Sequence, residues 1–190
     1  MKKFNTLFLS TIFIMAWMIS LHAEDRDERY IGFKSSTLYL DKTFSSHSST
    51  ENIGIYDRYD KFSLVGIQLQ RFLYDSNISS MFGGFEISMM FNDKNFLDDA
   101  LFDLDGKIGW DIDNLKIYGI MGEDLHFFGD YTSIGIHFGI GATYDIQDNL
   151  GVTANYKYYF MTTNQVNNLN EKLSYELSGF SLGILYKYNL

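Results

Sequence analysis

The chain has 190 residues, with 24 acidic side chains against 15 basic ones, and contains neither cysteine nor proline. Its formal net charge of −9 disfavours nucleic acid as a partner, because a polyanion would be repelled. Without cysteine no disulfide can stabilise the fold, so an exported domain of this size must be closed in another way. The length fits a single domain.

Residues 1–23 have the layout of a secretory signal peptide. Lys2 and Lys3 form a short positive region, residues 7–21 form an apolar run, and Ala23 precedes a charged stretch. The apolar run is short for the ~20 residues that a membrane-spanning helix needs, although an uncleaved anchoring helix is the alternative. Cleavage after Ala23 would leave residues 24–190 as one exported domain. It would carry 13 basic and 24 acidic residues, a formal charge of −11.

Eight segments of the exported part alternate apolar and polar residues with the period of two that is typical of a β-strand. In the sixth segment, for example, Ile136 and Phe138 share one face while Gly135 and His137 share the other. The abundance of tyrosine, phenylalanine and glycine, together with the absence of proline, favours many unbroken strands. The predicted strands are residues 30–40, 61–73, 85–91, 104–112, 115–121, 134–146, 152–160 and 180–190.

The connections between these segments are alternately short and long. Three short turns fall at residues 74–77, 113–114 and 147–149, and longer polar segments fall at residues 42–60, 92–100, 123–130 and 161–173. Every second connection of an up-and-down barrel lies at the same rim, and outer-membrane barrels have short periplasmic turns and longer external loops. The pattern therefore predicts four surface loops, with both termini in the periplasm.

The two faces of the strands separate a membrane barrel from a soluble barrel of lipocalin type, which turns its apolar face inward. The polar face is rich in glycine and holds isolated charges between small residues, which suits the crowded interior of an eight-stranded barrel. Aromatic residues near the strand ends fit the interfaces of a bilayer. The sequence thus predicts an all-β protein, an eight-stranded antiparallel up-and-down transmembrane β-barrel, with the soluble barrel as the alternative.

Two stretches resemble the small OmpA/OmpX-type outer-membrane β-barrel family. Residues 133–160 combine glycine-rich alternation, Tyr144-Asp145, a Gln-Asp-Asn turn and the run Ala154-Asn155-Tyr156-Lys157-Tyr158. The final strand resembles the signal read by the barrel assembly machinery, although this chain ends in Leu190 where that family ends in Phe. The resemblance implies a bacterial outer-membrane location, with lipid, lipopolysaccharide and the assembly machinery as partners. We expect no peptidoglycan-binding domain after the barrel region. It does not fix the activity, since relatives include membrane-stabilising proteins, adhesins and a few lipid-modifying enzymes.

The sequence contains no recognisable catalytic constellation. Lipid A deacylases need a histidine and a serine two residues apart on one strand face, so that the imidazole can deprotonate the hydroxyl. His137 has Gly139 at that position, and His47 lies between serines in a segment without a rigid element to hold it. We therefore expect no catalytic residue, no cofactor and no metal site, and a lipid-modifying enzyme is the less favoured reading.

Several polar groups are instead expected at the surface. His126, close to Asp124 and Asp130, is predicted as solvated loop surface, and Phe127 and Phe128 form a possible contact for an unknown surface ligand. Four acidic residues lack the spacing of a calcium-binding loop. They are expected to add surface charge that divalent cations bridge to lipopolysaccharide: Asp98, Asp99, Asp103 and Asp105.

The alternation also assigns a polar network to the barrel interior. A charge in so narrow a lumen needs a partner, and counting residues from the periplasmic turns predicts that Glu86 pairs with Lys107 and that Lys157 reaches Glu86 across the lumen. The predicted network is Gln68, Glu86, Lys107, His137 and Lys157. A wide pore needs about sixteen strands, so the chain is too short to form a general porin. We expect a non-enzymatic barrel that anchors four surface loops and serves envelope integrity or surface interaction. A narrow porin-like channel is the alternative.

Overall fold

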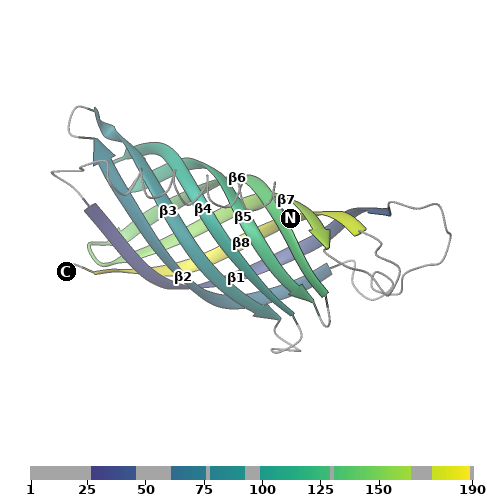
Figure 1. Ribbon diagram of the computed structural model, residues 1–190. Coiled ribbons are helices and arrows are strands. Elements are labelled where there is room, and N and C mark those ends of the chain that lie inside the picture. The colour runs from purple at the N-terminus through teal and green to yellow at the C-terminus, as the bar shows by residue number, and fades with distance from the viewer. Residues whose placement is uncertain are drawn as a thin grey trace.

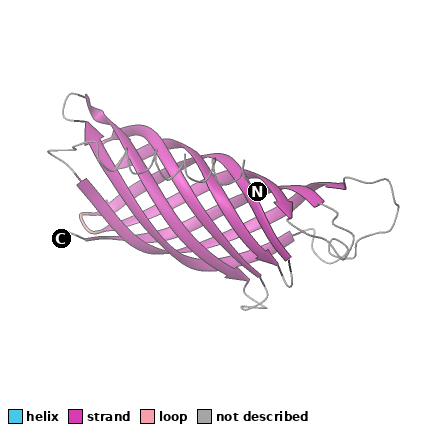
Figure 2. Ribbon diagram, in the orientation of Figure 1, coloured by secondary structure: helices cyan, strands magenta, loops and turns pink. Residues whose placement is uncertain are grey.

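A computed structural model describes residues 27–75, with a gap at 46–60, and residues 78–188, with gaps at 93–98, 129–130 and 164–172. The predicted signal peptide lies outside the described residues. All of the described structure is strand, apart from two tight turns (Figure 2). The strands are β1 (Asp27–Ser45), β2 (Lys61–Asp75), β3 (Ile78–Asn92), β4 (Asp99–Ile112), β5 (Leu115–Phe128), β6 (Tyr131–Gln147), β7 (Leu150–Thr163) and β8 (Leu173–Tyr188).

The eight strands form a closed antiparallel barrel in sequence order (Figure 1). Each strand pairs with its neighbour along the chain, and β1 closes the barrel by pairing with β8 over a long register, from Arg29 opposite Tyr188 to Ser45 opposite Leu173. Closure leaves no strand edge unpaired, which is the condition for a β-structure to cross a bilayer. The predicted fold class is therefore confirmed.

Most strands extend further than the alternation predicts. β3 begins at Ile78 rather than at residue 85, and β5 continues to Phe128. The prediction of a long loop over residues 123–130 is wrong, since β6 begins at Tyr131. This segment is polar because Asp124 and His126 point into a polar interior. Three longer connections, residues 46–60, 93–98 and 164–172, therefore lie at one rim, opposite the short turns.

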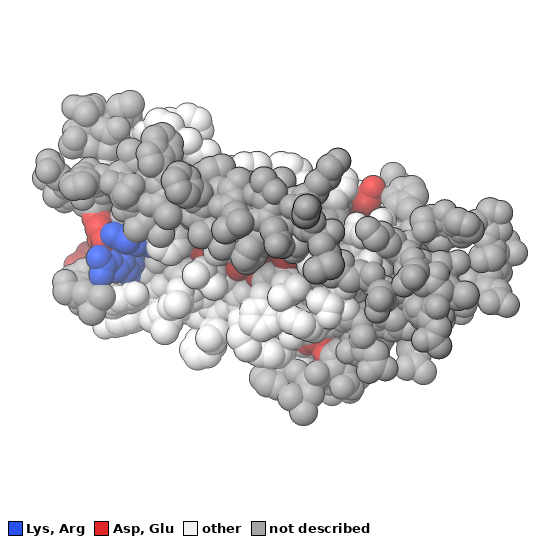
Figure 3. Space-filling view, in the orientation of Figure 1, with Lys and Arg blue, Asp and Glu red and all other residues white. Residues whose placement is uncertain are grey.

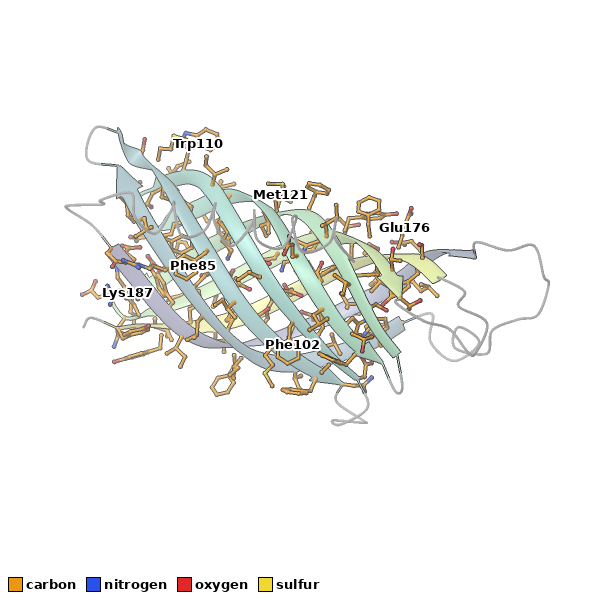
Figure 4. The ribbon with its side chains drawn as sticks, viewed as in Figure 1. Phe85, Phe102, Trp110, Met121, Glu176 and Lys187 are labelled. Carbon is orange, nitrogen blue, oxygen red and sulfur yellow. The ribbon has the colours of Figure 1, made fainter. Side chains whose placement is uncertain are left out.

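The outer face of the barrel is apolar over all eight strands (Figure 4). Three labelled side chains of the neighbouring strands β4 and β5, Phe102, Trp110 and Met121, point away from the lumen. The interior, by contrast, holds buried lysines and carboxylates. A lipocalin-type barrel has the opposite distribution, so the soluble alternative is wrong. A closed barrel with an apolar belt outside and polar groups inside is the architecture of bacterial outer-membrane proteins, and the outer membrane is the location of this chain. Among the described residues, no helix is long and apolar enough to span a bilayer.

Replacing Ile136 or Phe138 by lysine should lower the free energy of unfolding in lipid vesicles by about 2–4 kcal/mol, because both side chains face lipid in the central part of β6. The matched control is Ile146→Lys, at the periplasmic end of the same strand, which should cost about 0–1 kcal/mol. Urea titrations of the refolded barrels measure both. Equal costs would contradict the position of the belt on β6.

The neighbouring Gly135 faces the lumen, and the alternation alone would make serine a mild replacement there. The structure corrects this expectation. A Cβ atom on Gly135 would lie 2.4 Å from the carbonyl oxygen of Phe160 and 2.3 Å from the sulfur of Met161. Glycine at this position therefore makes room for the neighbouring strand β7, and serine requires the backbone to shift.

Candidate functional site

The centre of the lumen is a buried ion-pair network built around Glu86. The two carboxylate oxygens of Glu86 accept hydrogen bonds from Lys34 Nζ and Lys107 Nζ, each at 2.6 Å. Gln70 donates a further hydrogen bond to Glu86 at 2.9 Å. These groups come from four strands, β1 to β4, because inward side chains of tilted strands converge on the barrel axis.

A second group of charges surrounds Lys157 on β7. Its Nζ atom lies 2.7 Å from Asp103 Oδ2 and 2.7 Å from Asp105 Oδ2, both on β4. Lys34 lies 3.9 Å from Asp103 and so joins this group to the Glu86 group. The predicted direct pair of Lys157 with Glu86 is not among the ion pairs of the described residues, because the two β4 carboxylates take the lysine.

His137 completes the network on β6. Nδ1 lies 2.8 Å from Asp124 Oδ1, and Nε2 lies 2.9 Å from Asp105 Oδ1. A neutral imidazole carries a proton on one nitrogen only, whereas the imidazolium carries one on each, so the protonated ring fits this environment. Three lysines and an imidazolium then balance the four buried carboxylates Glu86, Asp103, Asp105 and Asp124.

Apolar layers lie above and below this charged layer. The layer toward the periplasmic turns is mainly aromatic and consists of Tyr30, Phe72, Tyr74, Phe82, Tyr118, Ile120 and Leu185. The layer toward the opposite rim consists of Leu38, Phe62, Leu64, Met90, Leu101, Tyr159, Met161, Tyr175 and Leu177. On β1 the succession Tyr30, Lys34, Leu38 passes through all three layers at intervals of four residues. Apolar side chains thus lie on both sides of the charged layer, and on the periplasmic side they are accompanied by the buried polar groups Lys116, Thr143, Thr153 and Asn155.

The rim opposite the periplasmic turns carries a further polar cluster inside the barrel. His126 Nε2 lies 2.7 Å from Asp99 Oδ1, and His126 Nδ1 lies 3.0 Å from the hydroxyl of Tyr175. Asn92 donates to the other oxygen of Asp99 at 3.0 Å. The expectation that His126 is solvated surface is therefore wrong, because the ring is buried between β4 and β8.

The expectation of an acidic surface patch is wrong as well. Asp99, Asp103 and Asp105 are buried in the lumen, and Asp103 and Asp105 neutralise Lys157 there. They are separated by even numbers of residues, four and two, so all three carboxylates lie on one face of β4, which is the inner face. Asp98 lies outside the described residues.

The structure places all five residues of the network predicted from the sequence in the lumen. Gln68 is fully buried, close to Gly183, where a Cβ atom would lie 2.3 Å from its amide nitrogen. Of the predicted surface contacts, Phe127 is part-exposed on the outer face and packs edge-on against Phe102, with ring centroids 5.8 Å apart. The side chain of Phe128 lies outside the described residues. Sequence reasoning missed Lys34, Asp103, Asp105 and Asp124, although their parity in the alternation matches the inward set.

The chemistry available in this lumen is that of paired charges. His137 has carboxylates at both nitrogens, and the described residues place no hydroxyl beside it in the manner of a nucleophile and base. Within the described ranges, no three histidine, aspartate or glutamate side chains are arranged to hold a metal ion. The charged groups at the centre of the lumen are held in ion pairs with one another.

The fold of the chain is similar to that of several solved barrels. Ail, the attachment invasion locus protein of Yersinia pestis, solved with the heparin analogue sucrose octasulfate, is 12% identical, over 85% of this chain and 97% of its own, with a TM-score of 0.45. A de novo designed transmembrane β-barrel is 14% identical, over 83% and 95%, with a TM-score of 0.42. Neisserial surface protein A is 17% identical, over 83% and 98%, with a TM-score of 0.42. No family model matches the chain, and no curated protein matches it in sequence.

Proposed function

We propose that this protein is a closed, non-enzymatic outer-membrane barrel of the OmpA/OmpX type, which anchors surface loops for envelope integrity or surface interaction. The filled lumen is the observation that carries the proposal. The central charges are paired with one another, and buried apolar side chains fill the lumen on both sides of them. An eight-stranded barrel has room only for its own side chains, so this interior serves to stabilise the barrel.

A narrow channel is the competing function, and single-channel recording on the refolded protein in planar bilayers separates the two. We expect no discrete conductance steps from the parent barrel, because an ion would have to pass both apolar layers and break buried ion pairs. Glu86→Ala should raise the conductance by loosening the charged layer. Sustained openings of the parent protein would overturn the closed-barrel proposal.

The loops at the rim opposite the short turns are the proposed contact surface. They include residues 46–60, 93–98 and 164–172, between strands whose ends all lie at that rim (Figure 1). A partner that binds there is to be sought with variants that shorten residues 46–60 and 164–172. The segment 123–130 is not a target for deletion, because most of it is β5.

Trypsin added to intact cells should cut this protein only in the surface loops. Each of the three longer segments holds or borders a trypsin site, at Arg58, Lys94 and Lys172, whereas the periplasmic turns at residues 76–77, 113–114 and 148–149 contain neither lysine nor arginine. Mass spectrometry of the fragments reads the cut sites. Cutting that requires a permeabilised outer membrane would reverse the proposed orientation, and Arg58→Gln is the control that should remove one cut.

The absence of catalysis is part of the proposal and has its own test. A lipid-modifying barrel changes the acylation of lipopolysaccharide in the cells that carry it. We expect the same mass spectrum of lipid A from cells with and without the protein, since His137 is held between two carboxylates inside the lumen. A lost or added acyl chain that depends on this protein would contradict the proposal.

A further inference from the structure

Two arginines lie side by side on the outer face of the barrel near the periplasmic rim. Arg29 on β1 and Arg71 on β2 are direct partners in the strand register. The carboxylate of Asp27 holds both of them: Arg71 donates from Nε at 2.9 Å and from Nη2 at 2.8 Å, and Arg29 donates from Nε at 3.0 Å and from Nη2 at 2.7 Å. The two guanidinium planes are therefore fixed in orientation by one acid.

This arrangement leaves a net positive charge with donors to spare. Each guanidinium has five N–H groups, and Asp27 occupies two of the three nitrogens of each. Burial raises the pKa of Asp27, but the hydrogen bonds from Arg71 and Arg29 outweigh burial and hold this pKa below its usual value, so the acid stays ionised. One carboxylate against two guanidinium groups gives a charge of +1. The arginine side chains remain 32% and 27% exposed.

The pair lies where the apolar belt ends. Outward positions on β1 run from Ile31 to Tyr39, a length of nine residues that matches a transmembrane strand. Lys61 lies beside Tyr39 at the opposite end, with Nζ 5.6 Å from the ring centroid. The arginines thus lie at the depth of the lipid headgroups on the periplasmic side. Figure 3 shows basic and acidic side chains gathered at the end of the barrel that carries the C-terminus in Figure 1.

Aromatic and apolar side chains surround the pair on the belt side. Arg29 is paired in the strand register with Tyr188 on β8, and Arg71 is paired with Phe85 on β3. Aromatic side chains beside the arginines are typical of the interface between membrane and water. Beyond the arginines, toward the middle of the barrel, the outer face of β1 and β2 is an exposed apolar surface made by Ile31, Phe33, Val65, Ile67 and Leu69. Hydrogen-bond donors for a phosphate and an apolar surface for acyl chains are therefore adjacent on β1 and β2.

We propose that Arg29 and Arg71 bind the phosphate of an anionic glycerophospholipid in the periplasmic leaflet, with its acyl chains along this apolar surface of β1 and β2. Arginine donates two parallel hydrogen bonds to a phosphate, and Asp27 presents both guanidinium groups for such contacts. The net charge of +1 favours an anionic headgroup over a zwitterionic one. Asp27 acts as a positioning residue.

Native mass spectrometry of the barrel released from bilayers tests this site. The probes are vesicles of phosphatidylcholine alone and of phosphatidylcholine mixed with phosphatidylglycerol. We expect the parent protein to retain one phosphatidylglycerol in preference to phosphatidylcholine. Arg29→Gln with Arg71→Gln should reduce that retention about thirtyfold, since each cation near an anionic lipid surface contributes about a fivefold factor. Added inorganic phosphate should not displace the lipid, because the acyl chains contribute to binding.

Three controls make the result specific. Heat-modifiable gel mobility shows whether each variant is folded. Arg29→Lys with Arg71→Lys keeps the charge but not the planar fork, so it should retain an intermediate amount of phosphatidylglycerol. Lys61→Gln removes a cation at the opposite rim and should retain as much as the parent. Equal retention of the two lipids by the parent, unchanged retention in the double glutamine variant, or an equal loss in Lys61→Gln would each overturn the site.

Discussion

Glu86→Ala should lower the free energy of unfolding in lipid vesicles by about 3–5 kcal/mol, because it removes the counterion of buried lysines. Lys34 and Lys107 both lie 2.6 Å from this carboxylate. Without it, Lys107 loses its nearest acidic partner, and Lys34 keeps only the more distant Asp103. Urea titration of the refolded barrel measures the loss, with Glu86→Gln as the control that keeps the shape and removes the charge.

A double-mutant cycle tests whether the pair acts as a unit. Glu86→Ala combined with Lys107→Met should cost less than the sum of the two single changes, by about 0.5–3 kcal/mol, because the double variant leaves neither charge of this pair buried alone. Lys34 remains in the double variant, so the recovery is expected to be partial. Strict additivity would mean that Glu86 and Lys107 are stabilised separately, and it would favour a lumen open to ions.

Lys157→Met should cost a similar amount, about 3–5 kcal/mol, for the opposite reason. Removing this lysine leaves Asp103 and Asp105 buried on the same face of β4 without the cation that lies 2.7 Å from each. Like charges in a medium of low dielectric repel strongly. Adding Asp105→Asn to Lys157→Met should recover part of the loss.

The matched control for this experiment is Lys187→Met. Lys187 pairs with Glu28 at 2.7 Å, but it lies part-exposed at the periplasmic rim, and Glu28 keeps Lys116 at 3.1 Å. Its removal should cost under about 1 kcal/mol. A cost for Lys157→Met as small as that for Lys187→Met would show that the central charges are hydrated rather than sealed.

The direction of each side chain was predictable from sequence, because parity along a strand decides between lumen and lipid. Lys34 on β1 and Glu86 on β3 each alternate with mainly apolar, outward-facing residues, so the alternation directs both side chains into the lumen. The level of each side chain along the barrel axis was harder to predict. The register pairs Glu86 with Asp105, so Lys107 reaches Glu86 diagonally past Gly84 rather than from the opposite position. Lys157 pairs with Asp103 and Asp105 because of the tilt and stagger of the strands, which a single sequence does not reveal.

The prediction of a loop over residues 123–130 was wrong because a single sequence does not show what surrounds a polar side chain. Polar residues in a chain are usually interpreted as exposed, yet Asp124 and His126 point into a polar lumen, where they meet His137 and Asp99 from the neighbouring strands β6 and β4. Composition indicates a polar environment but does not say whether that environment is water or the inside of a barrel. The layered lumen gives the clearest pattern of this kind, since Phe82, Glu86 and Met90 on β3 repeat the interval of four seen on β1.

The cross-lumen ion pairs also bear on how the barrel forms and how long it lasts. Glu86 on β3 pairs with Lys34 on β1, 52 positions away, and Lys157 on β7 pairs with Asp103 on β4, 54 positions away. A partly assembled sheet lays these charges against water, and only curvature and closure bring them together. Such long-range contacts make folding slow, and any unfolding that flattens the curved sheet must break them. The lifetime of the folded protein is therefore set by a kinetic barrier inside the lumen as well as by the lipid outside it.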